Sequence, residues 1–163
     1  MKRTLIALTA TLSLTAISTP LFAASATAPL GVSASVASNC TITTAPVSFG
    51  LYDTITGTAV SGTGTVNVAC TKGATGLTID LSTGSNIPSG PGTTRAMNSA
   101  AADILNYELF TDSGHLAPWS TGVTTTDAPS KASRAITVYG LISANQDVPA
   151  GSYSDTVVAQ INY

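Results

Sequence analysis

The residues of this chain that could carry out chemistry are few: one histidine, two cysteines and eight acidic side chains among 163 residues. His115 is the imidazole that could act as a general base near neutral pH, and nucleophilic hydrolysis would need a serine beside it. No G-x-S-x-G sequence occurs to present such a serine. His115 follows Gly114 in a polar stretch, where a histidine is most often solvated. The sequence therefore argues against an enzyme.

Metal and sugar binding are the other chemistries to consider. Asp53, Asp112 and Asp155 are candidate calcium ligands, but no D-x-D-x-D-G loop occurs. Asp112 begins an Asp-Ser-Gly sequence, and Asp155 precedes the last expected strand, so we expect turn roles for both. Trp119 could stack on a sugar ring in a lectin-like protein, although a single Trp beside Pro118 is more often an anchor that packs a loop on a sheet. We expect neither a cofactor nor a metal.

The composition favours a folded chain without long helices. Hydrophobic residues make up 44% of the chain and charged residues 9%, with 27 threonines and 19 serines. A chain this apolar, with a net charge of −2, is expected to collapse rather than stay disordered. A coiled coil or helical bundle is not expected, because Glu108 is the single glutamate. Six lysine and arginine residues are too few for a basic face that binds nucleic acid.

Residues 1–26 have the features of a secretory signal. Lys2 and Arg3 precede an apolar run over residues 5–17, and small residues follow at 23–26. Cleavage is expected after one of three alanines: Ala23, Ala24 or Ala26. An uncleaved membrane anchor is the alternative, but the run is shorter than the ~18 residues that a span needs. Cleavage removes Lys2 and Arg3, so we expect an exported chain with a net charge of −4. We expect no transmembrane span in the mature chain.

Export also suggests the role of Cys40 and Cys70. In an oxidising compartment a disulfide is the default state of such a pair. Closing the 31-residue loop from Cys40 to Cys70 would stabilise the fold by roughly 3–4 kcal/mol in the chain-entropy model. A redox or metal site is the alternative, but there is no C-x-x-C spacing, and His115 cannot complete a zinc shell.

After residue 26 the hydrophobic pattern has a period of two residues, interrupted by Gly, Pro, Ser, Asn and Asp. We expect strands around residues 30–37, 47–49, 66–70, 77–81, 95–97, 105–109, 136–142 and 157–163. The run 136–142 is nearly all apolar and predicts a strand buried on both faces, whereas 111–133 predicts a long polar loop. Seven or eight short strands predict an all-β sandwich, with a closed barrel as the alternative.

Two of these strands have the character of exposed sheet edges. The first, at 30–37, has no hairpin partner before Cys40, and residues 31–39 contain neither charge nor proline, the usual protections of an edge. The last strand runs to residue 163. Either the first strand is covered within its own fold, or it pairs with a neighbouring chain. Periodicity alone favours the first of these.

Several motifs, in their order and spacing, carry a family resemblance. They are an alternating arm that ends in Cys40, VSFGLYD at 47–53, VNVAC ending at Cys70, LTIDLSTG at 77–84, Arg95 followed by Met97, LNYELFTD at 105–112, Trp119, and YGLISANQDVPAGSYSDTVVAQINY at 139–163. With these motifs the chain resembles the spore coat protein U family, which includes the pilins of archaic, Csu-type chaperone–usher pili. The stretch 111–133 departs from the family pattern.

The resemblance implies an incomplete immunoglobulin-like β-sandwich, residues 40–163, whose missing strand is the N-terminal arm, residues 27–39, of the next subunit. It implies that four alternating arm residues are the donor side chains: Leu30, Val32, Ala34 and Val36. The Cys40–Cys70 disulfide would lie beside the acceptor groove. The C-terminal strand would pair with the chaperone or a subunit through four residues: Val157, Ala159, Ile161 and Tyr163.

The resemblance further implies a structural subunit of an extracellular pilus, serving surface attachment and biofilm formation. A periplasmic chaperone would supply a strand in transit, and an outer-membrane usher would exchange it for the arm of a neighbouring pilin subunit. The alternative is a spore-coat protein, or another secreted, self-contained β-sandwich that binds a ligand such as carbohydrate through residues 111–133.

Overall fold

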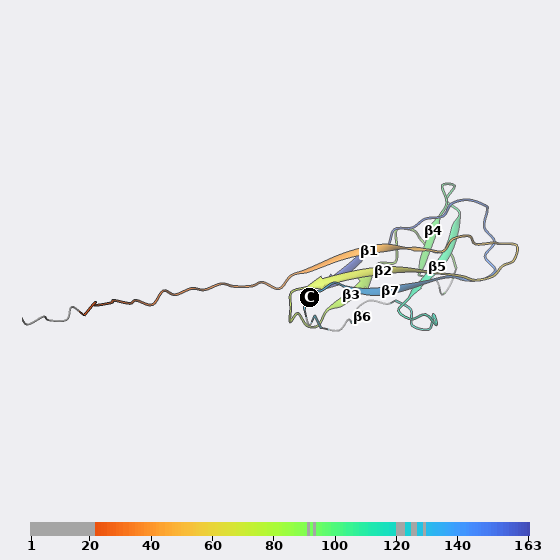
Figure 1. Cartoon of the computed structure of the whole chain (residues 1–163). Helices are drawn as coiled ribbons and strands as arrows, with labels where there is room; N and C mark the ends of the chain where they lie inside the picture. Colours follow the sequence, from red (N-terminus) through yellow and green to blue (C-terminus); the bar gives the residue numbers. More distant parts are fainter. Residues whose placement is uncertain (1–21, 91, 93, 120–122, 125–126, 129) are drawn as a thin grey trace, which may run out of the picture. The chain divides into compact units, whose positions relative to one another are not determined.

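The computed structural model describes residues 22–163 except 91, 93, 120–122, 125, 126 and 129. Most of the expected secretory signal, residues 1–21, lies outside the described residues. In the described part the chain folds into strands without a helix, and so no helix there could cross a membrane (Figure 1). The strands are β1 (Cys40–Ser48), β2 (Val60–Cys70), β3 (Thr78–Leu81), β4 (Arg95–Asn98), β5 (Ile104–Phe110), β6 (Val123–Thr124), β7 (Arg134–Ile142) and β8 (Ala159–Asn162).

The strands form two antiparallel sheets. One has the order β1-β2-β7-β5-β4 and the other β6-β3-β8. Their inner faces enclose the core, to which the larger sheet contributes Val66, Val68 and Val138, and the smaller sheet Ile79. Each such aliphatic side chain stabilises the fold by about 1.5–3 kcal/mol when fully buried. Two sheets with separate strand orders make a sandwich rather than a closed barrel, so the predicted all-β, immunoglobulin-like β-sandwich is confirmed.

The strand β7 corrects one expectation. Val138, Gly140 and Ile142 are buried, but Ala135 and Thr137 on the opposite face are exposed, so the prediction of a strand buried on both faces is wrong. The strand is central within its sheet, with β2 on one side and β5 on the other. The apolar residues on the outer face of β7 therefore reflect its two neighbouring strands, β2 and β5, and not a second layer packed on that face.

The N-terminal residues differ from expectation as well. In the described residues 22–39 there is no strand, although the period-two pattern predicts one at 30–37. The side chains of Leu30 and Val32 are each 88% exposed. The compact unit of the chain begins at Val36, and its first strand, β1, begins at Cys40. Alternation fails to predict the first half of β1 because that half is rich in threonine and lies at a sheet edge, where its outer side chains are exposed.

Candidate functional site

An elongated apolar groove of about 420 Å³ lies between β1 and the segment that leads into β8. One wall consists of residues 44–47 with Phe49, and the other of residues 153–157 with Ala159. Core side chains line the floor: Val66, Tyr107, Leu109 and Val138. The strands β1 and β8 are the outer strands of their sheets, and among the described strands each pairs along one edge. The sandwich is therefore open here, with an unpaired strand edge on each side of a hollow whose floor is made of core side chains.

Glycines in the larger sheet allow β1 to form the wall of the groove. A Cβ atom at Gly64 would lie 2.7 Å from Val47 Cγ2, and one at Gly140 would lie 2.6 Å from Phe49 Cζ. The side chains of Val47 and Phe49 therefore occupy space that any larger residue on β2 or β7 would fill. The Phe49 ring meets the Tyr107 ring edge-on, with 5.8 Å between centroids. This packing fixes the second half of β1 against the floor.

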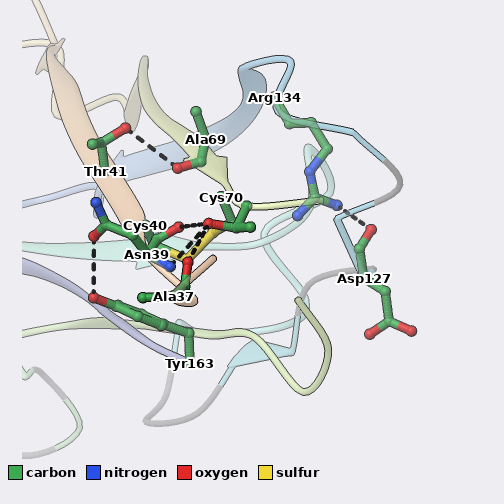
Figure 2. The surroundings of a disulfide bond; sticks show 10 residues. Ala37, Asn39, Cys40, Thr41, Ala69, Cys70, Asp127, Arg134 and Tyr163 are labelled. Carbon is green, nitrogen blue, oxygen red and sulfur yellow. Dashed lines mark hydrogen bonds between the residues drawn. A yellow bond between two sulfur atoms is a disulfide. The ribbon is translucent and has the colours of Figure 1, made fainter. Parts of the chain in front are cut away.

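The groove continues into a second hollow at one end. Beyond Phe49 it adjoins a second hollow of about 670 Å³, and the two share Val47, Phe49, Met97 and Tyr153 in their lining. Outside the groove lining, Tyr163 donates a hydrogen bond from its hydroxyl to Asn39 Oδ1 at 3.5 Å, just before Cys40 (Figure 2). An extended segment in the groove therefore has room beyond Phe49.

A polar contact holds the wall that leads into β8. The hydroxyl of Tyr107 donates to Asp155 Oδ2 at 2.6 Å, and Asp155 Oδ1 accepts hydrogen bonds from Ser85 N and Asn86 Nδ2, both at 2.9 Å. Burial, and next the hydrogen bond to Asp155, raise the pKa of Tyr107 above its ordinary value. The phenol is thus a neutral donor at physiological pH. Sequence reasoning expected a turn role for Asp155, whereas its carboxylate joins three separate parts of the chain.

A buried arginine ties the two sheets together near the groove. Arg95 on β4 is 2% exposed and donates from Nε to Ser82 O at 3.0 Å and from Nη2 to Leu81 O at 3.1 Å, at the end of β3. Glu108 Oε2 lies 3.8 Å from Arg95 Nη1. Burial lowers the pKa of Arg95, and Glu108 opposes this effect. A guanidinium with three backbone acceptors, the third being Trp119 O at 3.5 Å, and a carboxylate neighbour is a structural tie, because its donors are used within the fold.

The predicted disulfide is confirmed. Cys40 and Cys70 are bonded, and they occupy directly opposite positions in the pairing of β1 with β2 (Figure 2). The bond therefore fixes the first residue of the edge strand to the last residue of its neighbour. Because β1 forms a wall of the groove, the disulfide also fixes that wall in register.

The loop residues considered for chemistry have structural contacts. The Trp119 side chain is 3% exposed and donates from Nε1 to Ile79 O at 3.4 Å, which confirms a loop anchor and removes the ring from a sugar-binding surface. The His115 ring is half-buried edge-on against Phe110, with 5.1 Å between centroids, so the expectation of a solvated histidine is wrong. The ring is not fully solvated because Phe110 lies close enough to the loop to contact it.

The remaining aspartates shape turns. Asp112 accepts hydrogen bonds from the backbone N–H groups of Ala117 and Leu116, which lower the pKa of its carboxyl. This confirms the predicted turn. Asp53 accepts from the backbone of Ile55 in the same way. Among the described residues, no group of three His, Cys, Asp or Glu side chains could hold a metal ion.

The structure places the two predicted sets of pairing residues as follows. In the arm, the side chains of Leu30, Val32 and Val36 are exposed. In the C-terminal segment, alternate residues pack against the core: Val157, Ala159 and Ile161. Val157 and Ala159 also line the groove, whereas Tyr163 is outside the lining and bonds to Asn39. The sequence patterns did not identify Phe49, Tyr107 and Asp155 as groove residues. The glycines Gly64 and Gly140 were a usable signal, because a glycine within a strand can mark the place where a large side chain, here Val47 or Phe49, packs closely against the sheet.

Comparisons with known proteins agree with this architecture. The Spore Coat Protein U domain family matches residues 26–160. Protein U of Myxococcus xanthus is 33% identical over 180 aligned residues, which cover 99% of this chain and 98% of that protein. A chain in the crystal structure of the CsuC–CsuE chaperone–tip adhesion subunit pre-assembly complex, from archaic chaperone–usher Csu pili of Acinetobacter baumannii, is similar in fold, with a TM-score of 0.56 and 22% identity. The match covers 78% of this chain and 40% of that one.

Proposed function

The chain belongs to the Spore Coat Protein U domain family, and from this premise we propose that it is a structural subunit of an extracellular pilus, joined to its neighbours by strand donation. The arm, residues 27–39, of one subunit would fill the groove of the next. In transit a periplasmic chaperone would occupy the groove, and an outer-membrane usher would direct the exchange. Surface attachment and biofilm formation are the roles proposed for the fibre.

The observation that carries the proposal is the open groove between β1 and the β8 segment. A strand inserted there could pair with two free edges and cover the apolar floor at once. The same chain has a charge-free arm with an apolar residue at every second position from 30 to 36. Side chains of a strand alternate between faces, so Leu30, Val32, Ala34 and Val36 would all point into the groove. Each of the larger ones would contribute roughly 1.5–3 kcal/mol on burial.

Substitutions on the two faces of the arm test the proposal. Val32→Asp would place a charge in the apolar groove, and the matched control Ser33→Asp would place the same charge on the opposite face. We expect purified wild-type protein and Ser33→Asp to give a ladder of multimers on a gel without boiling, which collapses on boiling. We expect Val32→Asp to lose the ladder. A Val32→Asp ladder equal to that of Ser33→Asp would refute strand donation by the arm.

A donor peptide distinguishes a joint between subunits from a strand that closes its own domain. Under strand donation, the Val32→Asp body keeps an intact groove, so a wild-type peptide of residues 27–39 should bind it and raise its unfolding temperature. The variant would still fail as a donor to other subunits. If the arm instead belongs to its own domain, Val32→Asp unfolds the monomer and the peptide does not form a stable complex with it.

A spore-coat protein is the second candidate, and the family match together with the 33% identity to Protein U favours it. The same joint would serve a coat layer. Electron microscopy of assembled protein discriminates between them, because a pilus gives thin unbranched fibres whereas a coat gives a continuous layer.

A further inference from the structure

The chain segment that precedes β1 is held in place by a threonine. After Cys70 the β2 strand ends in a turn, in which Ala74 N donates to Thr71 O at 3.1 Å and Gly73 has a φ of 85°. One further backbone bond follows the disulfide, from Thr71 N to Asn39 O at 2.8 Å. Because β2 turns away, the N–H of Asn39 and the carbonyl of Ala37 no longer face a strand.

The Thr71 hydroxyl takes the place of the missing strand. Its oxygen accepts the N–H of Asn39 at 3.0 Å, and its single hydrogen can be donated to Asn39 O at 3.2 Å or to Ala37 O at 3.3 Å. A hydroxyl is both a donor and an acceptor, so it can serve both backbone groups. Figure 2 shows Ala37 and Asn39 beside the disulfide, with dashed lines at these contacts. Residues 37–39, here called the arm root, are thus held along the β2 side of the chain.

We infer that the Thr71 hydroxyl commits the arm to a neighbouring subunit, by preventing the arm root from forming the turn that would bring the arm into its own groove. The inference rests on the proposed function, because it concerns which groove the arm occupies. It makes Thr71 a positioning residue for assembly, although Thr71 does not line the groove itself.

A hairpin between the arm and its own β1 can fill the groove in only some registers. A one-residue slip turns every side chain to the other face, so the even-numbered arm residues must lie opposite Cys40 and Ile42, the residues in the first half of β1 that pack against the core. A three-residue turn over 37–39 satisfies this requirement, since it places Val36 opposite Cys40 and Leu30 opposite Pro46. In that register the arm reaches the groove wall that begins at Thr44.

With the arm root held, the same hairpin fails. The three-residue turn nearest to β1 that leaves the arm root in place is then 34–36. This turn places Ser33 opposite Ala37 and Leu30 opposite Cys40. Leu30 then lies beside Cys40, short of the groove wall that begins at Thr44. Ala34 and Val36 are consumed by the turn. The arm of a neighbouring subunit has no such constraint, because it is not connected to this β1.

The test uses the whole exported chain, unfolded with its disulfide intact and refolded over a hundred-fold range of concentration. Thr71→Val removes the hydroxyl and keeps the shape of the side chain, while Thr71→Ser keeps the hydroxyl. Thr41→Val is a matched control, because Thr41 Oγ1 donates to Ala69 O at 3.3 Å on the same pair of strands without holding the arm root. The share of monomer is measured by size exclusion, and the exchange of arm amides in that monomer by hydrogen–deuterium mass spectrometry.

We expect Thr71→Val to raise the ratio of monomer to multimer by about ten-fold, the effect of losing roughly one hydrogen bond, and to protect the amides of residues 30–36 of the monomer from exchange. Wild type, Thr71→Ser and Thr41→Val should form multimers whose share rises with concentration. Equal monomer shares and equal arm exchange in Thr71→Val and Thr71→Ser would overturn the inference. Failure of the wild type to form arm-joined multimers would instead refute the proposed function.

A second variant keeps the test decisive if Thr71→Val does not fold. Asn39→Gly retains the Thr71 hydroxyl but places glycine at the last position of the 37–39 turn, where a three-residue hairpin favours a left-handed residue. We expect it to shift the chain toward monomers with a protected arm. An Asn39→Gly monomer share equal to that of the wild type, with an unprotected arm, would also overturn the inference.

Discussion

The hydrogen bond between Tyr107 and Asp155 gives the sharpest test of how the groove wall is held. Tyr107→Phe deletes the hydroxyl and keeps the ring, so no large cavity forms and the edge-on contact with Phe49 remains. The Tyr107 side chain is 5% exposed, and its bond to the carboxylate is 2.6 Å long. Hydrogen bonds to charged groups contribute roughly 1.5–3 kcal/mol. We expect Tyr107→Phe to lower the free energy of unfolding by that amount, since Asp155 keeps its bonds from Ser85 and Asn86.

The pH dependence of the free energy of unfolding provides an independent test of this bond. The pKa of Tyr107 is raised in the folded state, mainly by burial and then by the bond to Asp155, so the folded protein holds this proton more tightly than the unfolded chain does. Its contribution is full below the ordinary tyrosine pKa of about 10 and is lost as the pH rises above it toward the raised folded value. The wild type should therefore lose more stability than Tyr107→Phe between about pH 9 and pH 11.

Urea unfolding followed by Trp119 fluorescence and circular dichroism measures both effects. Tyr139→Phe is the matched control, because Tyr139 lies half-buried on the outer face of β7, and we expect a change within about 0.5 kcal/mol. A double-mutant cycle with Asp155→Asn isolates the coupling between the two side chains. Tyr107→Phe within 0.5 kcal/mol of the wild type at neutral pH, with the same alkaline loss of stability, would refute the reasoning.

Three further predictions concern the disulfide, the glycines and a turn. Cys70→Ser should lower the level of subunit in the periplasm strongly, because about 3–4 kcal/mol is a large part of the stability of a small domain, and unchanged levels on an immunoblot would contradict this. Gly64→Ala should destabilise the protein by about 1–3 kcal/mol, because its Cβ would lie 2.9 Å from the backbone N of Val47. Gly140→Ala should be milder, because its Cβ would meet side-chain atoms only. Thermal unfolding of the two variants compares these effects. Asp112→Asn should reduce the loss of stability on acidification. The lowered pKa of Asp112 contributes to the stability of the fold above the unfolded pKa, and this contribution is lost as the pH falls below that value. Equal decreases in unfolding temperature with falling pH, in the variant and the wild type, would contradict this.

The parts of the fold that the sequence predicted are those in which local pattern and burial coincide. Residues 77–81 and 105–109 alternate because one face of each packs on the core, and both lie in or beside observed strands. The cysteine pair was predictable because export leaves few alternatives. Residues 40–46 could not be predicted as a strand, because they lie at a sheet edge, where the threonines on the outer face need no apolar alternation.

The site was less predictable than the fold, because its contacts join residues far apart in the chain. Tyr107 and Asp155 are separated by 48 residues, and nothing near either one in the sequence specifies the other. The burial of Arg95 likewise depends on carbonyl groups at the end of another strand. The groove itself is a property of two strand edges that meet without a third strand between them. A one-dimensional pattern marks the arm, but it does not mark the space that the arm is proposed to fill.

The position of the disulfide has a mechanical consequence for a fibre built as proposed. Tension on such a fibre would enter each subunit through the arm and reach Cys40, the first residue of an edge strand. The bond to Cys70 divides that force between β1 and β2, and β2 is paired with β7 along its length from Val60 to Val68. Antiparallel strands pulled along their axes are loaded in shear, so many hydrogen bonds resist together. Oxidised subunits should therefore withstand a larger pulling force than reduced ones, in which the load passes from β1 to β2 through hydrogen bonds alone.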